Sequence, residues 1–201
     1  MNLIAVSQRV DIVAEYDERR DSLDQAWLRF LDSCNVRPVL VPNDPEGAVS
    51  FVEEVNVSGV LLTGGNNLIS CGGDAPERDE TEIQLLDWAR KRDKPVAGVC
   101  RGMQLIQQSL GVRLAKVSGH VDVLHDISIQ AGTRVVNSFH SFGATETVSG
   151  LAVWARTKDG VIEAVRHQKE KILGVMWHPE RENSFDRKDV ELFKSFFGEG
   201  P

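Results

Sequence analysis

The chain has 201 residues, of which 41% are hydrophobic and 26% charged, and its formal net charge is -7. This length suits one well-packed domain spanning 1–201, and the composition excludes a disordered or fibrous protein. The acidic balance argues against nucleic acid as the main ligand. Three cysteines without a CxxC pair indicate neither a disulfide framework nor a zinc site.

No apolar run approaches the roughly 20 residues that a membrane helix needs. The first residues also lack the basic start and long apolar core of a signal peptide. We therefore expect a cytoplasmic protein with free thiols and no membrane partner. A homodimer is compatible with the sequence, which does not define the oligomeric state.

The first half of the chain alternates short apolar runs with amphipathic segments. The apolar runs predict strands at 3–7, 37–42, 58–65 and 95–99. The amphipathic segments predict helices at 22–34 (with Ser22 as N-cap), 45–55, 77–93 and 101–111. This alternation is typical of βαβ units. It predicts an α/β fold with a mostly parallel open sheet and helices on both faces.

The second half is richer in short β segments separated by turns. The segments "DISIQ", "TRVVNSF", "LAVWART", "GVIEAVRH" and "KILGVMW" predict antiparallel and mixed strands that complete the same sheet. A final helix is expected over 186–198, with Val190, Phe193 and Phe197 along one face. Ligands of such sheets bind at the carboxyl ends of the parallel strands, so side chains at those ends are candidates for function.

Cys100 lies at one of these ends, between the strand "PVAGV" and the helix "RGMQLIQQSLG". The pattern Gly-x-Cys-x-Gly matches a nucleophile elbow, a tight strand-to-helix turn in which the next backbone N–H, here that of Arg101, faces a developing oxyanion. A helix N-terminus also lowers the pKa of a thiol. The alternative is that Cys100 is a buried small apolar side chain. Cys34 and Cys71 lack this context.

A base for such a thiol stands at another predicted strand end. His178 follows the strand "ILGVMW" within "GVMWHPE", and Glu180 lies two residues further on. A carboxylate at this spacing can orient the imidazole and stabilise its charged form, which completes a triad. We expect His120, His125 and His167 to be structural or exposed. No ligand spacing among the histidines indicates a metal, so neither a metal nor another cofactor is expected.

These motifs, in this order, resemble the class I glutamine amidotransferases. The resemblance rests on "LLTGGNNL", "GVCRGMQL", "NSFHSFGA" and "GVMWHPE", and it spans nearly the whole chain. It implies a flavodoxin-like fold of that superfamily. It also implies a Cys–His–Glu triad with Cys100 as nucleophile, His178 as base and acid, and Glu180 as orienting residue.

The resemblance also implies roles for the surrounding residues. The backbone N–H groups of Gly65 and Arg101 would form the oxyanion hole, and Gln104 would hold the γ-glutamyl group of a small-molecule substrate. The motif "NSFHS" would border the glutamyl pocket with Ser138, His140 and Ser141. For His140 a purely structural, hydrogen-bonded role is the alternative.

Within this superfamily the chain is most similar to stand-alone γ-glutamyl hydrolases related to γ-glutamyl-γ-aminobutyrate hydrolase. It departs from them at Phe142, where glutamine is common, and in a shorter connection before "NSFH". Its size and the segment "GGDAPERDETE" resemble small bacterial hydrolases of γ-glutamyl-CDP-amidate. Those enzymes release glutamate and cytidine diphosphoramidate for capsule phosphoramidates.

The resemblance to this narrower group implies contacts on the leaving-group side of the substrate. Phe142 would contact the base of the nucleotide. Four arginines, Arg9, Arg19, Arg20 and Arg78, are candidate diphosphate ligands, with a solvated surface role as the alternative.

Three other functions stay open at this point. The first is hydrolysis of another γ-glutamyl amide, such as γ-glutamyl-γ-aminobutyrate. The second is that of a glutaminase subunit that supplies ammonia to a synthetase. The third, from a different class, is a catalytically inactive binding module on the same fold, against which the intact Cys100, His178 and Glu180 argue.

Overall fold

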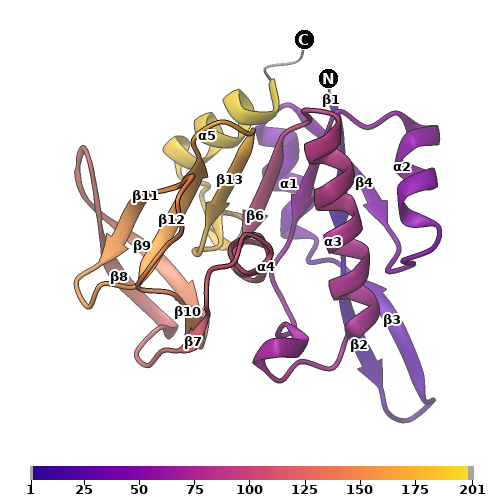
Figure 1. Cartoon of the computed structure of the whole chain (residues 1–201), viewed down its shortest axis with the longest axis horizontal. Coiled ribbons are helices and arrows are strands. Elements are labelled where there is room, and N and C mark those ends of the chain that lie inside the picture. Colours follow the sequence, from indigo (N-terminus) through magenta and orange to yellow (C-terminus); the bar gives the residue numbers. More distant parts are fainter. Residues whose placement is uncertain (1, 199–201) are drawn as a thin grey trace.

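The computed structural model describes residues 2–198, and a nine-stranded mixed sheet forms its centre (Figure 1). Five neighbouring strands run parallel, and four further strands extend the sheet in antiparallel fashion. The strand order is β4-β1-β5-β6-β13-β12-β11-β8-β9. This arrangement confirms the predicted α/β class with a mostly parallel half followed by antiparallel strands.

The parallel half is built from short apolar strands that are buried on both faces. Because both faces are covered, β5, β6 and β13 consist entirely of buried residues rather than alternating ones. The five strands are β1 (Asn2–Ser7), β4 (Val36–Val41), β5 (Gly59–Leu62), β6 (Val96–Val99) and β13 (Ile172–Val175).

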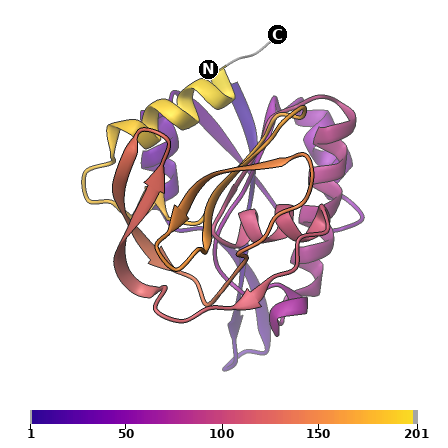
Figure 2. The ribbon, with the colours of Figure 1, turned by 60° about the vertical axis from the view of Figure 1, so that its left-hand side comes forward.

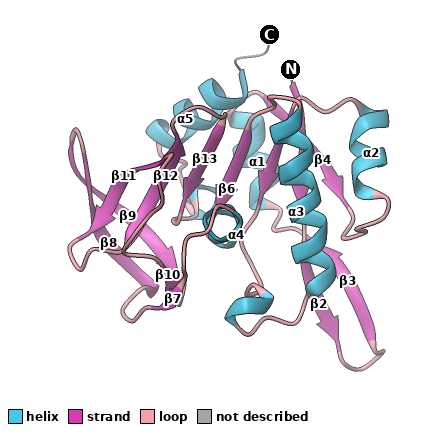
Figure 3. Ribbon diagram, in the orientation of Figure 1, coloured by secondary structure: helices cyan, strands magenta, loops and turns pink. Residues whose placement is uncertain are grey.

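Helices cover both faces of the parallel half (Figure 3). On one face, α1 and α5 pack Phe30, Phe193 and Phe197 against strand residues that include Val6 and Val99. On the other face, α2, α3 and α4 bury the alternate strand residues. The helices are α1 (Ala26–Ser33), α2 (Ala48–Val55), α3 (Pro76–Lys91), α4 (Arg101–Ser109) and α5 (Arg187–Gly198), with short 3-10 turns η1 (Ile69–Cys71) and η2 (Pro179–Arg181).

The antiparallel half contains the long hairpin of β8 and β9, which Figure 2 brings forward. A small two-stranded ribbon of β7 and β10 lies below it. The strands of this half are β7 (Ala115–Lys116), β8 (Val121–Ile129), β9 (Gly132–Phe139), β10 (Phe142–Gly143), β11 (Leu151–Thr157) and β12 (Ile162–His167).

One element was not expected from the sequence. Strands β2 (Arg9–Val13) and β3 (Glu18–Ser22) form a hairpin that projects past the end of β1 (Figure 1). Ser22 therefore pairs with Arg9 and does not cap a helix, and α1 begins at Ala26. The hairpin is highly charged and mostly exposed, so no apolar alternation marks it. Among residues 2–198 we find no helix long and apolar enough to cross a bilayer.

Candidate active site

Cys100 occupies the corner between β6 and α4, as the elbow motif predicts. Its backbone adopts φ 53° and ψ -108°, a conformation that is strained for any residue other than glycine. Gly102 makes this corner sterically possible, because a Cβ there would lie 2.0 Å from the carbonyl oxygen of Leu62. The first N–H groups of α4 have no acceptor within the helix, so the corner presents hydrogen-bond donors next to the thiol.

His178 lies beside Cys100 because their strands are neighbours. Strand β13 pairs in parallel with β6, Val175 opposite Val99, and the Cys100 N–H donates to the carbonyl of Val175 over 2.8 Å. Three residues beyond Val175, the imidazole of His178 shares its Nδ1 with Glu180 Oε1 at 2.7 Å. All three polar side chains are buried. The structure thus brings together the three predicted triad residues.

The electrostatic setting favours a thiolate and an imidazolium. Burial opposes ionisation of Cys100, but the charge and hydrogen bond of His178 outweigh it and lower the pKa of the thiol. Burial likewise disfavours the charged imidazole, yet the thiolate and then Glu180 raise the pKa of His178 to about 9. Each group therefore stabilises the charged form of the other.

Asn137 and Gly64 fix the position of His178. The Asn137 side chain accepts a hydrogen bond from the His178 N–H at 2.8 Å and donates to its carbonyl at 2.9 Å. At Gly64, a Cβ would lie 2.6 Å from His178 Cε1 and 3.5 Å from Cys100 Cβ. Only glycine leaves space for both reactive side chains at this point. Neither residue was assigned a role from the sequence.

The loop after β5 contributes Gly65, which was predicted to donate to an oxyanion. Arg78 on α3 holds this loop, because its guanidinium donates to the carbonyls of Thr63, Gly64 and Gly65 at 2.9, 2.9 and 2.5 Å. Arg78 is fully buried and paired with Glu82. The prediction that Arg78 contacts a diphosphate is therefore wrong, since its donors are used to build the loop.

Arg101 presents its backbone rather than its side chain to the site. Its guanidinium is buried and bound by Glu82 and Asp79 of α3. Its backbone N–H reaches the sulfur of Cys100 and contributes to the lowered pKa of that thiol. The Arg101 N–H and the Gly65 loop thus flank the sulfur, which is where an oxyanion would form if Cys100 attacked a carbonyl.

A cavity of about 490 Å³ opens over the thiol. Gly65, Arg101, Gln104, His140 and Ser141 line it, in agreement with the residues expected to contact substrate. The same wall includes Phe139 and Arg181, to which the sequence motifs had not pointed. Arg181 stacks on the Phe139 ring at 4.5 Å, and that ring lies edge-on to His178 at 5.7 Å between ring centroids.

Two predicted contacts do not line this cavity. Ser138 lies within β9 and is fully buried, with its hydroxyl donating to the carbonyl of His120 at 2.7 Å. Phe142 belongs to the β7–β10 ribbon, and only its carbonyl approaches the site, where it accepts from Gln104 Nε2 at 2.8 Å. The one-residue alternation of strand β9 explains the first error. Phe139, three residues before Phe142, supplies the ring at the cavity wall.

His140 combines the two alternatives considered for it. It lines the cavity, and its Nδ1 and Nε2 face the Phe142 carbonyl at 3.0 Å and Glu163 at 3.2 Å. Burial disfavours the charged ring, but the pairing with Glu163 prevails and raises the pKa of His140. His140 is therefore a hydrogen-bonded histidine whose positive charge also acts on Cys100.

The arginines of the β2–β3 hairpin are engaged by neighbouring carboxylates. Arg9 pairs with Asp11 at 2.8 Å, and Arg20 pairs with Glu18 on the same hairpin. Arg19 reaches Glu77 of α3. These contacts are largely exposed, so the solvated role considered for Arg9, Arg19 and Arg20 agrees with their surroundings.

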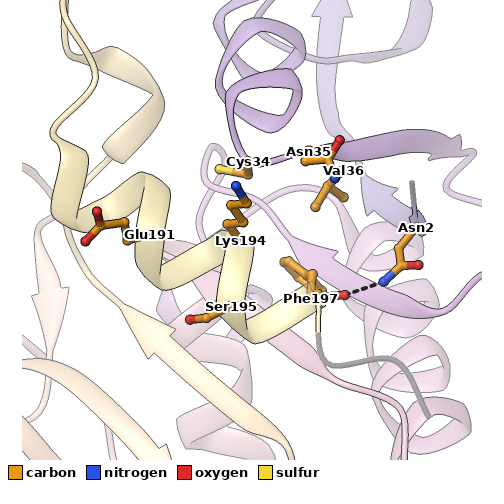
Figure 4. Close-up of a pocket in the computed structure, with 9 residues that line it drawn as sticks. Asn2, Cys34, Asn35, Val36, Glu191, Lys194, Ser195 and Phe197 are labelled. Carbon is orange, nitrogen blue, oxygen red and sulfur yellow. Dashed lines mark hydrogen bonds between the residues drawn. The ribbon is translucent and has the colours of Figure 1, made fainter.

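A larger cavity, of about 650 Å³, lies at the opposite edge of the sheet (Figure 4). It is lined by Asn2 and Val36 at the amino ends of β1 and β4, and Cys34 at the end of α1. In Figure 4 the amine of Lys194 points toward this thiol. Burial nevertheless raises the pKa of Cys34 to about 12, and no histidine lines the cavity within the described part of the chain. This site lacks what thiol chemistry requires.

The comparison with known families agrees with this geometry. Residues 18–198 match the model of the class I glutamine amidotransferases. The chain belongs to this family. The fold agrees as well, since the crystal structure of a glutamine amidotransferase from Thermotoga maritima matches with a TM-score of 0.70 at 15% identity, over 96% of this chain and 83% of that one.

Two curated relatives are similar over most of the chain. A γ-glutamyl-CDP-amidate hydrolase from Campylobacter jejuni is 28% identical over 199 residues, covering 96% of both chains. The glutamine-hydrolysing component of a GMP synthase from Haloarcula marismortui is 31% identical over 155 residues, covering 72% of this chain and 74% of the relative. The relatives thus include both a hydrolase and a component of a synthase.

Proposed function

We propose that this protein hydrolyses a γ-glutamyl amide, with Cys100 as the nucleophile, His178 as base and acid, and Glu180 as the orienting residue. The observation that carries the proposal is the placement of Cys100 in a strained elbow beside the buried His178–Glu180 pair. The lowered pKa of Cys100 and the raised pKa of His178 support a thiolate–imidazolium pair.

In the first half-reaction, the Cys100 thiolate attacks the γ-carbonyl carbon and forms a tetrahedral intermediate. The N–H groups of Gly65 and Arg101 donate to its oxyanion. His178 then protonates the leaving nitrogen, the C–N bond breaks and a γ-glutamyl thioester remains. In the second half-reaction His178 takes a proton from water, which attacks the thioester. The C–S bond breaks, glutamate leaves, and the thiolate–imidazolium pair is restored.

The proposed leaving group is a nucleoside diphosphate amide, which makes γ-glutamyl-CDP-amidate the substrate and cytidine diphosphoramidate the second product, for capsule phosphoramidates. The full-length similarity to the Campylobacter jejuni hydrolase supports this assignment. Arg181 offers a cation at the cavity wall, and its side chain is 36% exposed. Stacked on Phe139, it is placed to meet a phosphate that leaves past His178.

A substrate panel tests the proposal through glutamate release. We expect kcat/KM for γ-glutamyl-CDP-amidate to exceed the values for γ-glutamyl-γ-aminobutyrate and glutamine. Arg181→Gln should raise KM for the nucleotide substrate by about tenfold, because one charge-assisted hydrogen bond is lost, and should leave KM for the other two amides unchanged. Arg20→Gln on the exposed hairpin is the matched control and should change none of the values.

The other outcomes separate the alternatives. Equal hydrolysis of γ-glutamyl-γ-aminobutyrate would reject the nucleotide leaving group and retain the γ-glutamyl hydrolase. A glutaminase activity that appears only with a synthetase partner would instead support a role within an amidotransferase complex, which the similarity to the GMP synthase component keeps in view. No turnover of any amide, together with an unreactive Cys100, would indicate a binding module.

A further inference from the structure

A second group of polar side chains lies in the antiparallel half, away from the thiol. It consists of His120 just before β8, His125 within β8, and Glu163 on β12. Their ligand atoms lie within 4.8 Å of one another. The His120 Nδ1 is 3.4 Å from Glu163 Oε1, and the His125 Nε2 is 3.6 Å from Glu163 Oε2.

Within residues 2–198, three atoms of this group are buried without a hydrogen-bond partner. They are His120 Nδ1, His125 Nε2 and Glu163 Oε2. Glu163 is fully buried and His120 is 2% exposed, so water does not compensate these atoms freely. Buried polar atoms without partners are costly, and three that point at one another require a shared partner.

The neighbouring contacts determine which atom of His120 is available. Its Nε2 lies 2.9 Å from Asp159 Oδ2, and a carboxylate accepts, so this nitrogen carries the proton and donates. The Nδ1 of the neutral ring is then a lone pair aimed at the Glu163 carboxylate. Two electron-rich atoms facing each other at 3.4 Å need a cation between them. A carboxylate that orients a histidine in this way is the usual outer partner of a metal ligand.

We propose that His120 Nδ1, His125 Nε2 and Glu163 Oε2 bind a divalent transition-metal ion, and that zinc is the ion they fit best. Two imidazoles and one carboxylate are a common zinc set that leaves a fourth position open. Zinc–ligand distances of about 2.0–2.1 Å place the ligand atoms of a tetrahedron about 3.3–3.4 Å apart, close to the separations present here.

The surroundings are prepared for such an ion. The Ser138 hydroxyl and the His140 N–H both donate to the His120 carbonyl, at 2.7 and 3.0 Å, which fixes the backbone of this ligand. A cavity of about 500 Å³, lined by His120, His125 and Asp159 among others, gives access from solvent. Glu163 can use Oε2 for the ion while Oε1 keeps its contact with His140. The ion would connect β8 to β12 and does not take part in the proposed hydrolysis.

Zinc binding to the whole protein tests this site directly. Since the thiolate of Cys100 and the imidazole of His178 are themselves zinc ligands, the measurement uses Cys100→Ala as the parent protein. We expect calorimetry and metal analysis after dialysis to give one zinc per chain, and zinc to raise the Tm. Cobalt in place of zinc should give the visible absorption of a tetrahedral site with nitrogen and oxygen ligands.

Variants in this parent decide the assignment. His125→Ala should abolish stoichiometric binding, and Asp159→Asn should weaken it about 10- to 100-fold by removing the orienting carboxylate. The Asp159 side chain is 55% exposed, so the second variant is expected to fold even if the first does not. His167→Ala, which removes another histidine, is the control and should bind like the parent. The proposal is overturned if the parent binds less than one zinc, or if Asp159→Asn and His125→Ala bind like the parent.

Discussion

Cys100 and Cys34 are both buried thiols at the end of an element of secondary structure, yet the structure gives them opposite chemistry. Burial raises the pKa of Cys34 to about 12, with the nearby carboxylate of Asp189 acting in the same direction and Lys194 opposing it weakly. At Cys100 burial acts in the same way but is outweighed by His178. Burial by itself therefore makes a thiol inert, and a buried partner that can be charged reverses the outcome.

The backbone differs between the two corners as well. Cys34 ends α1 with φ -83° and ψ 1°, which any residue adopts. Cys100 has φ 53° and is held there by the close approach of α4 to β5 at Gly102. Strain of this kind costs about 1–3 kcal/mol and is found where it serves to position a reactive group.

Removal of each thiol should show the largest difference. Cys100→Ala is expected to lower kcat for glutamate release by about 10⁴-fold or more, because the nucleophile is lost. Cys34→Ala is expected to keep kcat within about twofold, as it changes only packing at the opposite edge of the sheet. Circular dichroism should show that both variants fold. Near-normal turnover in Cys100→Ala would place the nucleophile elsewhere.

Within the triad, the base and its orienting residue should differ in weight. His178→Asn is expected to cost about 10⁶-fold in kcat and Glu180→Gln about 10⁴-fold, because His178 transfers protons in both half-reactions whereas Glu180 only orients and charges it. Steady-state kinetics of the two variants measures this. Glu182→Gln is the control, since a glutamine can still accept from Asn137. A larger loss at Glu180 than at His178 would contradict these roles.

The pH profile should reveal the charged pair. The pKa of His178, raised to about 9, means that the imidazolium persists through neutral pH, so kcat/KM should fall as the pH rises through about 9. Glu180→Gln removes one cause of the raised pKa and should move this limb to lower pH.

Stability is linked to the same group. The folded pKa of His178 lies above its ordinary 6.5, so its contribution to stability is complete below about pH 6.5 and is lost as the pH rises through about 9. An alkaline limb that does not move in Glu180→Gln would assign it to another group.

The smallest effect concerns the backbone and reverses between the two corners. At position 100, glycine should give a more stable protein than alanine by about 1 kcal/mol, because only glycine adopts φ 53° without strain. At position 34, alanine should be more stable than glycine by about 0.5–1 kcal/mol. Denaturant unfolding of the four variants measures both differences. The same order at both positions would mean that the elbow is not strained.

Much of this arrangement could be predicted from sequence, since apolar strands and the glycines around Cys100 are local signals. The two buried strand ends at Cys100 and His178 were found because both are marked by short motifs. The β2–β3 hairpin was missed because its charged residues show no apolar alternation. Phe139 and Phe142 were confused because only the strand register decides which ring faces the cavity.

Long-range pairing hid the remaining features. Arg78 looked like a free cation in the sequence, but it is buried by contacts with the loop 63–65 that only the fold creates. His120 and His125 are separated from Glu163 by about forty residues of chain, so no ligand spacing revealed their approach. Local motifs thus predicted the chemistry, whereas partners distant in sequence required the structure.

Labelling with a chloroketone analogue of glutamine tests the role of Cys100 most directly, because the electrophilic carbon of the analogue is delivered by the γ-glutamyl pocket. We predict that at neutral pH one equivalent attaches to Cys100, with activity lost in proportion, and that Cys34 and Cys71 stay unmodified in the peptide map. A γ-glutamyl substrate should slow the labelling. Attachment to another residue, or full activity in protein labelled at Cys100, would contradict the assignment of Cys100 as the nucleophile.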